Sequence, residues 1–86
     1  MDLKKVQATY MATKAIYEAA LEVEDWEKLE EVEEEYFDSE RELVQWGLDQ
    51  AVEKGKFTRE QAKQLIRDMS MEQYHKMAEM TARVAL

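Results

Sequence analysis

The sequence predicts an all-α protein, and three observations support that fold class. The 86 residues contain no proline and only two glycines, so most of the residues that interrupt helices are missing. Apolar side chains recur every three to four positions along most of the chain, which is the period of an amphipathic helix. No apolar run approaches the length of about 18 to 20 residues that spans a bilayer. We therefore expect one helical domain over residues 1–86, without a membrane partner: an antiparallel bundle of three main helices, completed by homodimerisation.

The first helix is expected from Asp2, as its N-cap, to about Val23. One side of this helix is a stripe of larger apolar residues that runs from Leu3 to Leu21 and includes Tyr10 and Tyr17. A second stripe of small residues allows close approach of another helix. Because more than half of the circumference is apolar, we expect this helix to be covered on two sides, with the second stripe as the dimer interface. That interface consists of Ala8, Ala12, Ala15 and Ala19.

A second helix is expected from about residue 26 to residue 54, after a corner at Glu24 and Asp25, with Asp25 as its candidate N-cap. Its apolar positions stay in phase across Asp38 and Ser39, which favours one unbroken helix. The alternative is a break at Ser39, because Ser39 and Glu42 have the spacing of a capping box.

The clearest turn in the sequence surrounds Gly55, which suits the left-handed residue after a helix. Thr58 and Gln61 then have capping-box spacing and predict the start of a third helix. Ser70 and Gln73 repeat that spacing, so a break of the third helix near Ser70 is an open alternative.

Net charge is concentrated in one segment. Residues 22–42 hold twelve acidic and two basic side chains, whereas the whole chain has a net charge of −8. Most of these acids fall opposite the apolar stripe of the second helix, as on any solvated face. Their shared sign is unusual, because exposed helices gain i,i+4 pairing from mixed charges. We therefore weigh an ordinary exposed face against a docking surface, whose expected residues are Glu27, Glu31, Glu34, Glu35, Asp38, Glu42 and Trp46.

These features predict a cytoplasmic protein-interaction module, an adaptor, chaperone or regulator that binds a partner protein with a basic surface. An inhibitor that imitates nucleic acid, as mobile elements encode, is the alternative function. Direct nucleic-acid binding is not expected, because the acidic chain repels phosphates and the helix from Ser70 offers few basic side chains. We expect no cofactor and no enzymatic activity, since no phosphate-binding loop, catalytic triad or cysteine is present.

A metal-binding helical bundle is the third hypothesis. Glu33 and Glu40 fall within or beside the apolar stripe of the second helix, and Glu72 precedes His75 by three residues, the spacing that di-metal bundles use. In an unbroken third helix, however, His75 would face away from the apolar stripe. A break at Ser70 would change that orientation.

Overall fold

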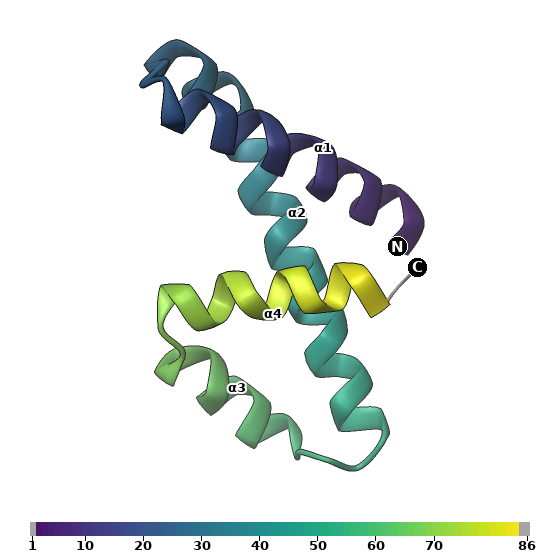
Figure 1. The fold of residues 1–86 in the computed structure, drawn as a ribbon. Helices are drawn as coiled ribbons and strands as arrows, with labels where there is room; N and C mark the ends of the chain where they lie inside the picture. The colour runs from purple at the N-terminus through teal and green to yellow at the C-terminus, as the bar shows by residue number, and fades with distance from the viewer. Residues whose placement is uncertain (1, 85–86) are drawn as a thin grey trace.

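A computed structural model describes residues 2–84, and it contains four helices and no strand in that range (Figure 1). They are α1 (Leu3–Glu22), α2 (Trp26–Glu53), α3 (Arg59–Asp68) and α4 (Met71–Val84). The all-α class is thus confirmed. Four helices take the place of the three main helices that were expected, because the chain breaks between α3 and α4, near Ser70, as the open alternative proposed.

The corner between α1 and α2 is a Schellman motif in which a glutamate takes the left-handed position. The amide of Glu24 donates to the carbonyl of Leu21 at 3.2 Å, and the amide of Asp25 donates to the carbonyl of Ala20 at 2.9 Å. Glu24 has φ 56. Asp25 then caps α2 by accepting from the amide of Lys28 at 3.2 Å, as the sequence predicted.

Helix α2 is continuous over 28 residues, which confirms the unbroken interpretation. Ser39 lies buried in the helix, and its hydroxyl donates to the carbonyl of Tyr36 at 2.8 Å. Its side chain is therefore satisfied within the helix and caps nothing.

The predicted turn at Gly55 is also confirmed. Gly55 has φ 76, and the amide of Lys56 donates to the carbonyl of Ala51 at 2.9 Å. Thr58 and Gln61 form a complete capping box at the start of α3.

After the break at Ser70, a second capping box begins α4. The amide of Ser70 donates to Gln73 Oε1 at 2.9 Å, and the amide of Gln73 donates to Ser70 Oγ at 3.1 Å. Met69 is extended, with φ −72 and ψ 133, so the helical hydrogen bonding stops there. The break thus separates two helices that a single apolar stripe had suggested were one.

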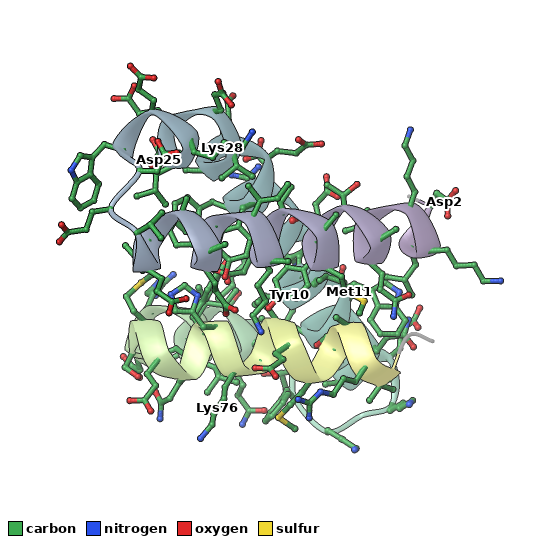
Figure 2. All side chains as sticks on the ribbon, turned by 45° about the horizontal axis from the view of Figure 1, so that its top comes forward. Asp2, Tyr10, Met11, Asp25, Lys28 and Lys76 are labelled. Carbon is green, nitrogen blue, oxygen red and sulfur yellow. The ribbon has the colours of Figure 1, made fainter. Side chains whose placement is uncertain are left out.

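The helices cross one another. Helices α1 and α2 form an antiparallel hairpin, whereas α4 lies across α2 and runs antiparallel to α1 (Figures 1 and 2). The Gln7 side chain of α1 donates to the carbonyl of Ala82 in α4, and Lys14 Nζ lies 3.7 Å from Glu79 Oε2. Gly47 permits the crossing, because a Cβ there would lie 2.9 Å from Thr81 Oγ1.

The core lies where α1, α2 and α4 meet, and α3 covers the far end of α2. Ala62 is the buried residue of α3, and Arg59 Nη1 lies 3.5 Å from Asp49 Oδ1 of α2. The core cluster consists of Tyr10, Tyr36, Leu43, Val44, Leu48, Ala62, Ala78 and Ala82.

Helix α1 is covered on one side only within a single chain. Tyr10 is buried as expected, but Leu21 is 48% exposed, and the polar Gln7 is buried. Cover for the second side of α1 was expected from a homodimer, and it remains a prediction. All four residues of the predicted dimer interface are exposed: Ala8, Ala12, Ala15 and Ala19.

The molecule is flat, with principal extents of 43 × 27 × 16 Å. Its accessible surface is 6255 Å², whereas a globular monomer of this mass exposes about 5,300 Å². Within the described residues, no helix is both long and apolar enough to cross a membrane.

Candidate functional site

The acidic face of α2 points away from the core. The buried side of this part of the helix contains Leu29, Val32 and Tyr36, and the 3.6-residue period directs the remaining positions outward. Figure 2 shows carboxylates projecting from the end of the molecule that Asp25 and Lys28 mark. All six predicted acids are exposed: Glu27, Glu31, Glu34, Glu35, Asp38 and Glu42.

Two of these six acids have ion pairs in the described part of the chain. Glu31 Oε2 lies 3.3 Å from Lys28 Nζ, and Asp38 Oδ1 lies 3.1 Å from Arg41 Nη2. Among residues 2–84, no Lys, Arg or His nitrogen lies within ion-pairing distance of the other four acids. We call the six carboxylates together the acidic face.

The acidic face borders α1 at a hollow of about 280 Å³. Glu35, Asp38 and Glu42 line one side of it, and Lys5 and Val6 lie on the other. Trp46 lies elsewhere: it is half-buried and lines a groove between α2 and α4. The structure therefore groups the six predicted acids on one face, whereas Trp46, one turn beyond Glu42 on the same helix, lines a different hollow.

Glu40 departs from the acidic face and is 1% exposed. Its Oε2 lies 2.7 Å from Nδ1 of His75, which is half-exposed on α4. The imidazole donates to the carboxylate when Nδ1 carries the proton. The prediction that His75 faces away from the core holds only for an unbroken third helix. The break at Ser70 turns His75 toward α2.

Three buried or half-buried tyrosines surround Glu40. Burial, followed by the nearby Tyr36 and the charge of Glu40, raises the pKa of Tyr10 above its usual value. Burial and the charge of Glu40 raise the pKa of Tyr36 to about 12. Burial and Glu40 likewise raise the pKa of Tyr74. The phenols therefore stay neutral beside the carboxylate.

The other residues of the metal hypothesis do not join this pair. Glu33 and Glu72 are exposed, so the position of Glu33 within or beside the apolar stripe does not bury it. Residues 2–84 contain no group of three or more His, Cys, Asp or Glu side chains placed to hold a metal ion. The Glu40–His75 pair connects α2 to α4 by a hydrogen bond.

Sequence reasoning found each half of this pair but not their contact. Glu40 was conspicuous as an acid in an apolar stripe, and the Ser70 capping box was the signal that reorients His75. The buried bond of Gln7 had no such signal, because its acceptor is a backbone carbonyl in α4.

No family model, curated protein or solved structure matches this chain.

Proposed function

We propose that the chain is a small protein-interaction module whose acidic face docks on the basic surface of a partner protein. The observation that carries the proposal is the exposure of six carboxylates along one helix, four of which have no ion pair among residues 2–84. A face that served solubility alone would gain stability from interspersed lysines. Carboxylates without local cations remain available to cations of a partner.

The rigidity of α2 supports a docking role. The acidic face spans residues 27–42 of one continuous helix, which corresponds to about 22 Å of length at 1.5 Å per residue. Lys28 and Arg41 each pair with an acid on the same helix. A partner therefore meets charges whose positions are fixed before binding, which lowers the entropy cost of association.

A charge-reversal variant tests this proposal. Glu34→Lys combined with Glu35→Lys places lysines four residues from Glu30, Glu31 and Asp38, so the helix should gain i,i+4 pairs and remain folded. The matched control is Glu53→Lys combined with Asp68→Lys. It makes the same change in net charge at exposed positions at the ends of α2 and α3, where helix dipoles favour lysine.

Partners captured from the native host by the wild-type protein should be purified and titrated against both variants. We expect the Glu34/Glu35 variant to lose binding and the control to keep it, and we expect wild-type binding to weaken as salt rises. A partner that binds the Glu34/Glu35 variant as tightly as the wild type would contradict the proposal.

The alternative function is an inhibitor that imitates nucleic acid. The observation that favours it is the row of carboxylates along a straight helix, at steps of about 6 Å for positions four residues apart. In that case the captured partner binds DNA or RNA, and added nucleic acid displaces this chain from it. If nucleic acid does not compete, the inhibitor function is contradicted and the interaction module is the function that is left.

We also propose that the chain forms a homodimer through the exposed alanine stripe of α1. Met11 and Ile16 lie on the same helix and are 54% and 40% exposed, which adds apolar surface beside the alanines. The flat shape and the large accessible surface of a single chain support association.

A further inference from the structure

A groove of about 550 Å³ lies between the C-terminal half of α2 and α4. Gly47, Ala51 and Thr81 line it with small side chains, and Trp46 and Met77 add larger apolar surface. Met80 and Val84 also line it and are 62% and 79% exposed. The groove therefore leaves apolar side chains open to solvent.

The charged side chains of this groove are all lysines. Lys54, Lys56 and Lys76 line it and are exposed, and no carboxylate lines it. Figure 2 shows Lys76 on the side of α4 that faces away from α1. Among residues 2–84, no carboxylate lies within ion-pairing distance of these three lysines. They are therefore free to bind carboxylates of a ligand, although the chain as a whole is acidic.

The groove has the length of a short helix. Its lining extends from Trp46 to Lys54 on α2 and from Gln73 to Val84 on α4, so its walls are about 12 Å and about 16 Å long at 1.5 Å per residue. A three-turn helix is about 16 Å long. Methionines suit such a groove, because their flexible side chains adapt to the shape of a bound helix.

We infer that this groove binds an amphipathic acidic helix of a partner protein, with apolar side chains at i, i+4 and i+7 on the groove floor and carboxylates beside the lysines. Charge complementarity selects this occupant: the open apolar floor requires apolar side chains, and the unpaired lysines require negative charge around them. The inference does not depend on the acidic face of α2, since the two surfaces have opposite charge and share no residue.

Trp46 provides a direct probe of occupancy. Trp26→Phe removes the other tryptophan, which is 62% exposed and does not line the groove. The protein carrying this substitution should be titrated with a synthetic helical peptide that has Leu at i, i+4 and i+7 and Glu at the positions that flank this stripe, beside the groove lysines. We expect saturable binding and a blue shift of Trp46 emission, because the bound peptide excludes water from the indole.

Two peptides and two protein variants separate this proposal from nonspecific association. Replacing Leu by Ala, or Glu by Gln, in the peptide should weaken binding. Exchanging Lys54, Lys56 and Lys76 for Gln should raise Kd about tenfold, as expected for three exposed ion pairs. The matched control exchanges Lys4, Lys5 and Lys63 for Gln and should leave Kd within about twofold of the parent value, because these lysines lie outside the groove.

Three results would overturn the inference. The first is the absence of a saturable change in Trp46 emission with the Leu/Glu peptide, in a protein whose circular dichroism shows native helix content. The second is equal binding of the Gln peptide, or equal weakening by both lysine variants, which would show that the groove does not select charge. The third is a concentration-dependent change of Trp46 emission without peptide, which would show that a second copy occupies the groove.

Discussion

Glu40 of α2 contacts His75 of α4, although the two residues are 35 positions apart in the sequence. The carboxylate is buried, whereas the imidazole is half-exposed. Loss of the imidazole would leave the carboxylate short of a partner in a site from which water is largely excluded. The pair therefore stabilises the crossing of α2 and α4.

His75→Ala should lower the free energy of unfolding by about 1–2 kcal/mol, the cost of leaving a buried acceptor underbonded. In a Glu40→Gln background the same substitution should cost less, because no buried charge remains to be satisfied. Urea denaturation of the wild type, the two single variants and the double variant measures this coupling. Additive effects within error would show that the two side chains do not stabilise each other.

Alkaline pH should destabilise the fold through its buried tyrosines. The pKa of Tyr36 is raised from 10.0 to about 12, so the folded state keeps the proton that the unfolded state releases above pH 10. The stability that neutral Tyr36 contributes is therefore complete below pH 10 and is lost as pH rises toward 12. Each such phenol reduces the free energy of unfolding by about 1.4 kcal/mol per pH unit in this window.

Tyr10→Phe should reduce this alkaline loss, because the pKa of Tyr10 is raised in the same direction. Urea denaturation at neutral pH and at steps above the usual pKa of tyrosine gives the difference, with the variant unfolding at higher pH than the wild type. An unchanged pH dependence would show that Tyr10 ionises as readily in the folded state as in the unfolded state.

Among the helices, two end in the same Schellman motif with different residues at the left-handed position. Glu24 occupies it after α1 with φ 56, and Gly55 occupies it after α2 with φ 76. A side chain raises the energy of this conformation, whereas glycine adopts it freely. A Cβ added at Gly55 would meet no heavy atom within 4 Å, so backbone strain is the main cost of a substitution there.

Glu24→Gly should therefore raise the free energy of unfolding by about 0.5–1 kcal/mol, and the reciprocal Gly55→Glu should lower it by a similar amount. Thermal unfolding followed by circular dichroism measures both shifts. A lower Tm for Glu24→Gly would mean that the glutamate side chain stabilises the corner by contacts that exceed the backbone strain.

The two serines with capping-box spacing have different roles. Ser70 caps α4, whereas Ser39 lies inside α2 and bonds to the preceding turn. Ser70→Ala should lower the free energy of unfolding by about 1 kcal/mol. Ser39→Ala should change it by less than about 0.5 kcal/mol, because alanine favours the helix and the Tyr36 carbonyl keeps its helical environment. Equal losses in denaturant titrations would contradict this distinction.

Across the whole molecule, charge and apolar surface are segregated. The acidic face lies on the first half of α2, and the lysine-lined groove lies between its second half and α4. The alanine stripe of α1 is a third exposed surface. A thin molecule of this kind has little interior relative to its surface, so partners have several separate faces to contact.

Ala12→Glu should dissociate the proposed homodimer, because it places a charge in the middle of the small-residue stripe. Ala12→Ser keeps the small size and should keep the dimer. Sedimentation velocity at micromolar concentration distinguishes the two states. A wild-type protein that sediments as a monomer under these conditions would contradict the dimer.

Features that depend on neighbours within about four residues could be predicted from the amino-acid sequence alone. These are the all-α class, the caps at Asp2, Asp25 and Thr58, the turn at Gly55 and the outward direction of most acids of α2. Each follows from local hydrogen bonding or from the helical period, so residue type and spacing are sufficient. The positive φ of Glu24 could not be predicted in this way, because no glycine occupies that position.

Which helix faces which became clear only from the tertiary structure. Whether Ser39 or Ser70 interrupts a helix depends on packing, since both have the same local signal. The contact of Glu40 with His75, the burial of Gln7 against Ala82 and the groove between α2 and α4 all follow from the angle at which α4 crosses α2. The crossing angle depends on how side chains pack at contacts such as that of Gly47 with Thr81. Because these two residues are distant in sequence, no local pattern predicts the angle.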